Sequence, residues 1–245
     1  MGIDLAAGEA KTAIAEIRWG PGHATVEGLR VGASDEVLLA GIARADKAGI
    51  DCPLGWPEPF IEFLAAHRAG QLTAPEDVGG QRWRRRLAYR STDEVIRART
   101  GLVPLSVAAD RIGHTAMRCA GLLAILARTG RPVDRLGAGV VVEVYPAAAL
   151  KAWGLPWRGY KGPAKADVLG HLVDALAVTA PWLLLGGFEP VCRRTDHAVD
   201  AVIAALVARA AATDRTAQPE GEQAALAGVE GWIALPTTPL EQLCP

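Results

Sequence analysis

The spacing of apolar residues over the first 31 positions predicts three strands. Residues 2–6 form a short apolar run that ends in small side chains, and residues 12–19 alternate between apolar and polar with a period of two. A Gly-Pro-Gly turn at 20–22 leads into a third segment with strand character at 24–31. Because only short links join these segments, we expect them to pair as an antiparallel meander.

After these three segments, the spacing of apolar residues predicts first a helix and then one more strand. Ser34 is a suitable N-cap, and apolar residues recur three and four positions apart up to Ala45. Residues 48–55 have the composition of a short buried strand that proline and glycine bring to an end. We predict that residues 57–138 are helical throughout and form an insertion that covers the sheet.

The second half of the chain contains one strong strand signal. Residues 140–145, Val-Val-Val-Glu-Val-Tyr, are nearly continuous β-branched residues, which is typical of a strand buried on both faces. Residues 181–187 are expected to turn the chain. Three helices are predicted, at 147–153, 167–177 and 196–212, and the last of them carries a regular apolar stripe.

The order of these elements indicates a fold. It runs strand, strand, strand, helix, strand, helical insertion, strand, helix, and finally a C-terminal helix, which is the order of the ribonuclease H-like fold. We therefore predict one α/β domain over residues 1–245, with a mixed five-stranded sheet and flanking helices. The insertion at 57–138 falls between strands 4 and 5.

Composition narrows the class of protein. Half of the 245 residues are apolar and 22% are charged, which excludes a disordered chain and a coiled coil. No apolar run approaches the roughly 18 residues of a membrane helix, and an acid at position 4 argues against a secretory signal. The four cysteines are scattered, without a Cys-x-x-Cys pair, which argues against a zinc ribbon or a disulfide framework. We expect a soluble cytoplasmic protein without membrane contact.

The distribution of charge along the chain is compatible with a local anion-binding surface. A net charge of −1 excludes a globally basic nucleic-acid binder. Between Arg82 and Arg99, however, seven arginines face only two acids. Such a surplus is consistent with a phosphate-binding face, and equally with a solvated helix in an arginine-rich protein.

Four acids fall at positions that the predicted fold would bring together. Asp4 lies in the first strand, Asp51 ends the fourth, Glu143 lies inside the fifth, and Asp200 is one turn into the last helix. A carboxylate within a buried strand costs several kcal/mol unless it is paired or bound to metal. Glu143 therefore needs an arginine from the insertion, solvent at a strand end, or a divalent cation. Oxygen ligands of this kind suit Mg²⁺ or Mn²⁺.

The start of the last helix adds a candidate base. His197 and Asp200 are three positions apart and so lie on the same side of a helix. Asp196 has a simpler explanation as the N-cap. We predict that Asp4, Asp51, Glu143 and Asp200 are catalytic metal ligands and that His197 assists them.

Two basic residues are candidate phosphate contacts. Arg90 can hold a phosphate with two donors, and Lys161 is a point charge on a predicted turn. In the alternative interpretation, Asp93 pairs with Arg90 and holds it in place.

Several segments carry a resemblance to a known family. They are Gly2–Ala6, Ile50–Gly55, Arg90–Asp93, Glu143–Ala148, Tyr160–Lys161, Asp196–Ala201 and Glu230–Pro236. The chain resembles, from residue 2 to 236, the family catalogued as domain of unknown function 429, whose members are regarded as predicted nucleases of ribonuclease H-like fold.

A more distant similarity is to Holliday-junction resolvases of the RuvC type. Asp4, Asp51, His197 and Asp200 match the metal-binding positions of those enzymes, and Glu143 has no plain counterpart. The resemblance implies hydrolysis of phosphodiester bonds in DNA or RNA by two metal ions about 3.5–4 Å apart.

Two other function classes stay open. The start Gly-Ile-Asp-Leu-Ala also resembles the first strand of sugar kinases and actin-like ATPases, which need two such domains and a second phosphate loop that this sequence lacks. The other class is a non-catalytic nucleic-acid or nucleotide-binding module. A metal titration separates the three: a nuclease binds Mn²⁺ without nucleotide, a kinase binds ATP, and a non-catalytic module that kept only the fold binds neither.

Overall fold

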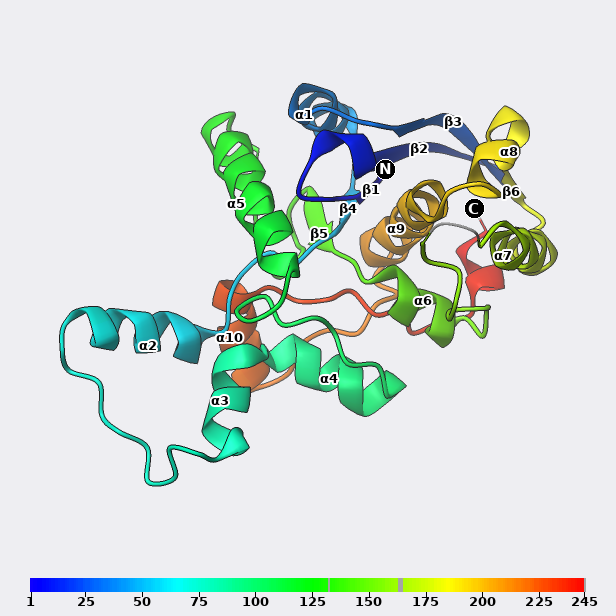
Figure 1. Cartoon of the computed structure of the whole chain (residues 1–245). Coiled ribbons are helices and arrows are strands. Elements are labelled where there is room, and N and C mark those ends of the chain that lie inside the picture. Colours follow the sequence, from blue (N-terminus) through cyan, green and yellow to red (C-terminus); the bar gives the residue numbers. More distant parts are fainter. Residues whose placement is uncertain (132, 163–164, 245) are drawn as a thin grey trace.

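A mixed six-stranded sheet forms the centre of the protein (Figure 1). The computed structural model describes residues 1–131, 133–162 and 165–244, apart from the side chain of residue 166. The strand order is β5-β4-β1-β2-β3-β6. The strands are β1 (Gly2–Asp4), β2 (Ala13–Gly20), β3 (His23–Val31), β4 (Ala48–Asp51), β5 (Val141–Glu143) and β6 (Leu183–Leu184).

The predicted meander is confirmed, and the number of strands is corrected. β1, β2 and β3 pair antiparallel in sequence order, while β4 pairs parallel to β1 and β5 pairs parallel to β4. The sixth strand, β6, lies within the predicted turn 181–187 and pairs parallel to β3 at Ala24 and Thr25. Two residues are too short a run to produce a periodic pattern, which is why the sequence predicted five strands and not six.

Helices cover both faces of the sheet. They are α1 (Asp35–Arg44), α2 (Glu58–Arg68), α3 (Gln81–Ala88), α4 (Ser91–Thr100), α5 (Ile112–Arg128), α6 (Pro146–Ala152), α7 (Ala166–Thr179), α8 (Glu189–Cys192), α9 (Asp196–Ala212) and α10 (Glu222–Glu230), with short 3-10 helices at Glu9–Lys11, Gly186–Phe188 and Leu240–Leu243. Ser34 caps α1 as predicted, because its hydroxyl accepts a hydrogen bond from the amide of Val37 at 3.4 Å. α10 has no counterpart among the predicted elements.

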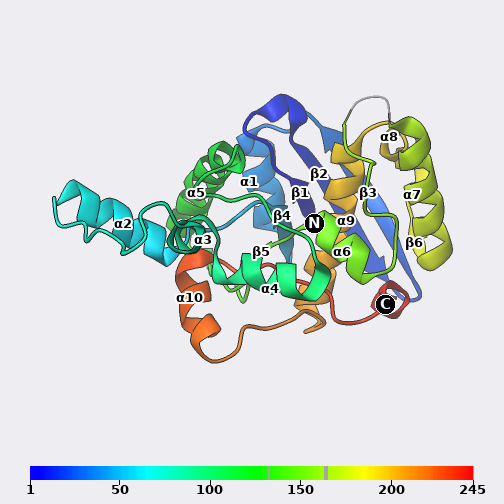
Figure 2. The ribbon, with the colours of Figure 1, turned by 60° about the horizontal axis from the view of Figure 1, so that its bottom comes forward.

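The insertion between β4 and β5 is helical only in part. Irregular connections at 69–80 and 101–111 separate α2 from α3 and α4 from α5, so the prediction of helix throughout 57–138 is too broad. In Figures 1 and 2, α2 and the segment that follows it extend away from the sheet. Every residue of α2 keeps at least some solvent exposure.

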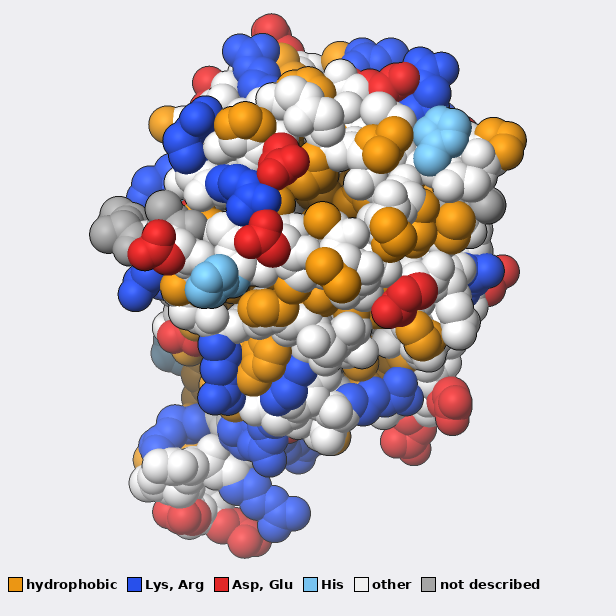
Figure 3. Space-filling view, turned by 90° about the vertical axis from the view of Figure 1, so that its right-hand side faces the viewer, with side chains coloured by type: hydrophobic (Ala, Val, Ile, Leu, Met, Phe, Trp, Pro, Cys, Tyr) orange, Lys and Arg blue, Asp and Glu red, His pale blue; other side chains and the backbone are white. Residues whose placement is uncertain are grey.

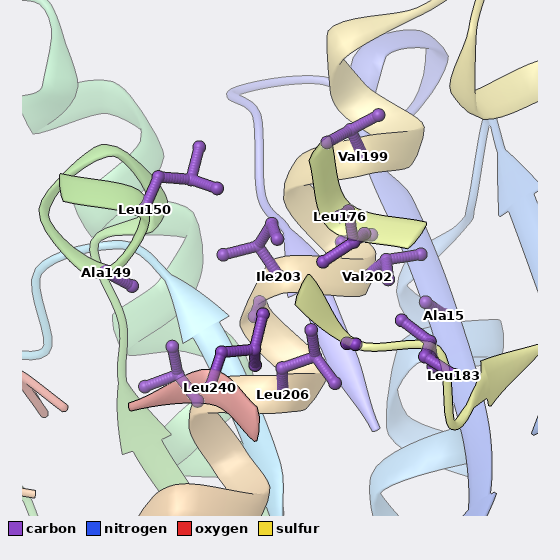
Figure 4. Close-up of a cluster of buried hydrophobic side chains, with 14 of the residues drawn as sticks. Ala15, Ala149, Leu150, Leu176, Leu183, Val199, Val202, Ile203, Leu206 and Leu240 are labelled. Carbon is purple, nitrogen blue, oxygen red and sulfur yellow. The ribbon is translucent and has the colours of Figure 1, made fainter. Parts of the chain in front are cut away.

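The core lies on both sides of the sheet, and α9 fills most of one side. The predicted bounds 196–212 are those observed, and 12 of the 17 residues of α9 are buried. Figure 4 shows Val199, Val202, Ile203 and Leu206 of α9 among side chains from the sheet and the surrounding helices. A second buried cluster on the other face joins the sheet to α1 and α5.

Two surface properties complete the description. No helix in the described ranges combines the length and apolar character that crossing a bilayer requires. On the face that carries α7 and α8, apolar side chains lie among charged side chains of both signs (Figure 3). Lys and Arg side chains gather in the lower part of that view, the end at which α3 and α4 lie in Figure 1.

Candidate metal centre

Two aspartates lie side by side at the ends of parallel strands. The register of β1 and β4 places Gly2 opposite Gly49 and Asp4 opposite Asp51. Because side chains alternate between the faces of a strand, these four residues share one face of the sheet. That face is the one against which α9 packs.

The two glycines allow α9 to lie unusually close to the sheet. A Cβ atom on Gly2 would lie 2.1 Å from the carbonyl oxygen of Ala201, and one on Gly49 would lie 2.3 Å from that of Ala204. Real Cβ atoms do not make contacts this short, so larger residues would push the helix away. The glycines therefore determine how near the first turns of α9 come to the two aspartates.

Asp200 of α9 completes an acidic triad with Asp4 and Asp51. One carboxylate oxygen from each residue lies within 4.8 Å of those from the other two. Asp4 and Asp200 are buried, and Asp51 is partly exposed. The structure thus brings together three of the four predicted acids.

Side chains from outside the triad bind two of its members, Asp4 and Asp200. The Nδ1 atom of His197 lies 2.6 Å from Oδ2 of Asp4. The hydroxyl of Tyr160 donates to Oδ1 of Asp200 at 2.8 Å, and Nζ of Lys161 lies 2.7 Å from Oδ2 of the same carboxylate. Sequence reasoning had noted Tyr160 only within the family resemblance, because a buried tyrosine has no local signature.

Asp196 has a structural role that differs from the predicted one. Thr195 occupies the N-cap position, and Asp196 is the first residue of α9. Its Oδ2 accepts a hydrogen bond of 2.9 Å from the amide of Gly162. Asp196 therefore ties the segment that carries Tyr160 and Lys161 to the start of α9.

Burial and the neighbouring negative charges raise the pKa of two members of the triad, Asp51 and Asp200. Burial raises the pKa of Asp51 well above its ordinary value; Lys161 opposes this shift, and Asp4 and Asp200 add to it. Burial also raises the pKa of Asp200 against the opposing charge of Lys161. Desolvation works against the ammonium of Lys161, but Asp200 and Asp51 outweigh it and hold the pKa of Lys161 well above its usual range.

The pKa of His197 is raised, whereas burial alone lowers the pKa of a histidine. Its hydrogen bond to Asp4 raises the pKa of the imidazole, although partial burial works against this. About 31% of its side-chain surface is exposed. Because Nδ1 is engaged by Asp4, the remaining ring nitrogen is the one available for proton transfer.

The triad has the donor set of a hard divalent cation. All three ligands are carboxylates, the type that Mg²⁺ and Mn²⁺ prefer. An ion about 2.0–2.1 Å from each oxygen holds adjacent ligand oxygens about 3 Å apart and opposite ones about 4.2 Å apart, so carboxylate oxygens at the 4.8 Å limit would have to draw closer to share one ion. Both oxygens of Asp200 already have a partner, but a carboxylate offers about four acceptor sites, so Asp200 can still ligate.

Glu143 lies outside this triad. It pairs in register with Ile50, one residue before Asp51, and the alternation of side chains turns it to the opposite face of the sheet. Its two oxygens bind the guanidinium of Arg90 at 2.7 and 2.8 Å, and Oε2 also accepts from the amide of Leu54 at 2.9 Å. The alternative interpretation, in which an arginine of the insertion neutralises Glu143, is the one that the structure shows.

The guanidinium of Arg90 is fully engaged in contacts within the protein. Only 1% of the residue is exposed. Its guanidinium also contacts Asp93 at 2.9 Å and the carbonyl oxygen of Glu230 at 3.1 Å. The structure therefore does not present Arg90 to a phosphate, and it supports the interpretation in which Asp93 holds Arg90 in place.

Glu230 is a buried acid that the sequence pointed to only within the family resemblance, without a role. Its carboxylate accepts hydrogen bonds from the amide of Glu58 at 2.9 Å and from that of Ser91 at 2.7 Å. These are the first residues of α2 and α4, whose free amides attract a negative charge. Glu230 thus joins α2 and α4, two of the four helices of the insertion, to the C-terminal end of α10.

The arginine-rich segment is divided between structural and exposed side chains. Arg85 and Arg97 share Glu94, at 2.8 and 3.7 Å. Arg82 and Arg86 of α3 are exposed and make no ion pair within the described ranges. A cationic surface on α3 is therefore present, although it is smaller than the count of seven arginines implied.

A cavity of about 380 Å³ opens beside the triad, and Asp51, Tyr160 and Lys161 are among its lining residues. A larger groove of about 740 Å³ lies between α2 and α5 and contains none of the triad residues. The smaller cavity is the one that can bring a ligand to the acids.

Comparison with known proteins gives a family and no activity. A family model described as "Protein of unknown function (DUF429)" matches residues 2–224. No curated protein and no solved structure matches the chain.

Proposed function

Since the chain belongs to the DUF429 family, whose description assigns no activity, we propose from its acidic centre that it is a metal-dependent phosphodiesterase, with nucleic acid as its substrate. The observation that carries this proposal is the convergence of Asp4, Asp51 and Asp200, three carboxylates with oxygens within 4.8 Å of one another. Buried acids at such spacing repel, and a divalent cation is the partner that relieves the repulsion most fully.

The residues of the site divide the chemistry among themselves. Asp4, Asp51 and Asp200 would hold the cation. When bound there, a divalent cation would supply Lewis acidity toward a phosphoryl oxygen and toward attacking water. His197, oriented by Asp4 and with a raised pKa, can give a proton to the leaving oxygen. Lys161 lies beside the triad and can attract the substrate's phosphate.

We also propose that this α/β protein has a ribonuclease H-like fold, and the arrangement of its strands and helices supports this. An antiparallel meander of β1 to β3 is extended past β1 by parallel strands β4 and β5, with α9 across one face. Its candidate ligands lie on the first strand, at the end of the strand after α1, and on the C-terminal helix of the core. We also propose a cytoplasmic location, where nucleic acid and Mg²⁺ are available together.

A substrate screen tests the proposal. We expect Mn²⁺- or Mg²⁺-dependent cleavage of at least one of a fluorescent single strand, duplex or branched junction, or of bis(p-nitrophenyl) phosphate. Asp4→Asn and Asp51→Asn should lose this activity at least 100-fold, whereas Asp46→Asn should retain it, because Asp46 is exposed and lies outside the triad. Absence of cleavage, together with absence of any Mn²⁺ effect on thermal stability, would overturn the proposal. Binding of ATP instead would favour a phosphotransferase.

A further inference from the structure

The cavity beside the triad has an apolar rim that the acidic centre does not explain. Its lining includes Val103 and Leu105, on the connection between α4 and α5. Val103 is 54% exposed and Leu105 is 44% exposed, so the cavity that they line does not bury them. Pro104 between them is buried and restricts the backbone. Exposed apolar side chains at the mouth of a cavity are typical of a surface that contacts a ligand.

The lining of the cavity also includes basic side chains, beside the acids Asp51 and Glu143. Lys161 lines it next to Asp51, and Arg111 lines it from the residue before α5. Arg111 is exposed and has no ion-pair partner in the part of the chain that the structure describes. Trp157 adds an aromatic wall, with the guanidinium of Arg158 at 3.9 Å from its ring centre. The cavity thus offers an apolar and aromatic surface and at least two positive charges.

A nucleotide combines the features that such a cavity would recognise. Its base is flat and can stack against apolar and aromatic side chains, whatever its identity. Its phosphate is an anion that Lys161 and Arg111 can bind. A volume of about 380 Å³ is near the lower end for small-molecule sites, and so matches a single nucleotide. A base within a duplex could enter only after it had been extruded from the stack.

The rim is also joined to the exposed arginines of the insertion. The hydroxyl of Ser106, next to Leu105, donates to the carbonyl oxygen of Ala88 at 2.6 Å. Ala88 is the last residue of α3, which carries the exposed Arg82 and Arg86. A strand that leaves the cavity over the rim would therefore pass toward positive charge.

We propose that this cavity binds one unpaired nucleotide and that single-stranded nucleic acid is the substrate class of the triad. The proposal rests on the proposed phosphodiesterase function for its second half. Val103 and Leu105 contact the base, and Lys161 and Arg111 bind the adjoining phosphates. The next phosphodiester bond then lies beside Asp51.

Binding without turnover tests the cavity separately from catalysis. Fluorescence anisotropy in the presence of chelator would measure the affinity of a labelled ten-nucleotide single strand and of the same sequence in a duplex. The variant Val103→Ser/Leu105→Ser removes the apolar rim at exposed positions. The matched control, Leu72→Ser/Val78→Ser, changes two exposed apolar residues on the segment between α2 and α3.

We expect the single strand to bind at least fivefold more tightly than the duplex. The rim variant should lose about tenfold in affinity for it, because the base no longer buries two aliphatic side chains. The control variant should bind as the unchanged protein does, and both variants should keep the Mn²⁺-induced rise in melting temperature. Equal affinity for single strand and duplex, or an unchanged affinity in the rim variant, would overturn the proposal.

Two further arms separate the possible sources of the ligand. If adenosine monophosphate displaces the strand at concentrations near the strand's own dissociation constant, the ligand is a free nucleotide and the single-strand assignment is overturned. Displacement by inorganic phosphate at the same concentrations would overturn the role of the base. If the single strand binds through the rim but is never cleaved with Mn²⁺, the phosphodiesterase function fails, while the binding site remains.

Discussion

Asp4 and Asp51 lie directly opposite each other in the parallel pair of β1 and β4, on the sheet face that α9 covers. Two carboxylates in this position repel each other, and Asp200 adds a third. The arrangement is costly for a protein without a bound cation, because burial already disfavours each charge. The effect of this repulsion on stability and on metal binding can be measured without knowledge of the substrate.

Removing one charge from the triad should stabilise the metal-free protein. In Asp51→Asn the shape is kept and the charge of the carboxyl, whose pKa is raised well above its ordinary value, is lost. We expect the melting temperature in chelator to rise by about 2–4 °C for each kcal/mol of relieved repulsion. The Mn²⁺-induced rise seen in the unchanged protein should disappear, because the cation loses a ligand. A lower metal-free melting temperature and an intact Mn²⁺ effect would show that Asp51 is a structural partner.

Removing Lys161 should strengthen metal binding. Its ammonium lies 2.7 Å from Oδ2 of Asp200 and repels a cation at the triad. In Lys161→Met we expect the Mn²⁺ dissociation constant, measured by calorimetry, to fall by about 30-fold, the effect of removing one unit charge about 4 Å from a doubly charged ion in water. The metal-free melting temperature should fall in the same variant, because the triad loses its counter-charge. Arg158→Met, also at an exposed basic position near the cavity, is the control and should leave the constant within twofold.

The pairing of His197 with Asp4 should make stability depend on pH. The pKa of His197 is raised in the folded protein, so the charged pair contributes fully below the ordinary histidine value of about 6.5. Its contribution is lost as the pH rises through the higher folded value. Urea denaturation in chelator should show a larger difference between the unchanged protein and His197→Gln at pH 6 than at pH 9. The exposed His171 provides the control substitution, His171→Gln. A difference that is the same at both pH values would contradict the pairing.

Gly49 should be required for the approach of α9 to the sheet. In Gly49→Ala the new Cβ would lie 2.3 Å from the carbonyl oxygen of Ala204, so the helix that carries Asp200 has to move. We expect a loss of several kcal/mol in the free energy of unfolding, typical of overpacking in a core, and a weaker Mn²⁺ effect. Gly8→Ala is the matched control, because nothing lies within 4 Å of its Cβ position and its φ of −133° suits alanine.

Glu143 should prove essential for stability and dispensable for the metal. In Glu143→Gln the guanidinium of Arg90 keeps Asp93 but loses a buried carboxylate that it binds at 2.7 Å. We expect a destabilisation of about 3 kcal/mol by chemical denaturation, the lower end for a broken buried ion pair. The exposed pair of Arg18 and Glu27 provides the comparison, and Glu27→Gln should destabilise the protein far less than Glu143→Gln. Loss of the Mn²⁺ effect in a folded Glu143→Gln protein would return Glu143 to the ligand set.

Local pattern was sufficient for most of the elements and for three of the four acids. A period of two located β2, a short apolar run located β1, the turn at 20–22 marked the start of β3, and the apolar stripe located α9 with its observed bounds. Asp4 and Asp51 could be found because an acid at the end of a buried strand stands out against its apolar neighbours. Their proximity was expected only from the predicted fold, and the parallel pairing that places them opposite each other is a finding of the structure.

The tertiary structure decided which partner each buried charge has. Glu143 and Arg90 are 53 positions apart, and only the register of β5 against β4 shows that Glu143 faces away from the triad. β6 and the cavity rim at Val103 and Leu105 also depend on packing between distant segments. A sequence pattern reports which side of an element is buried, because burial depends on the residue itself. It does not report what lies opposite, because that depends on how the elements are brought together in the fold.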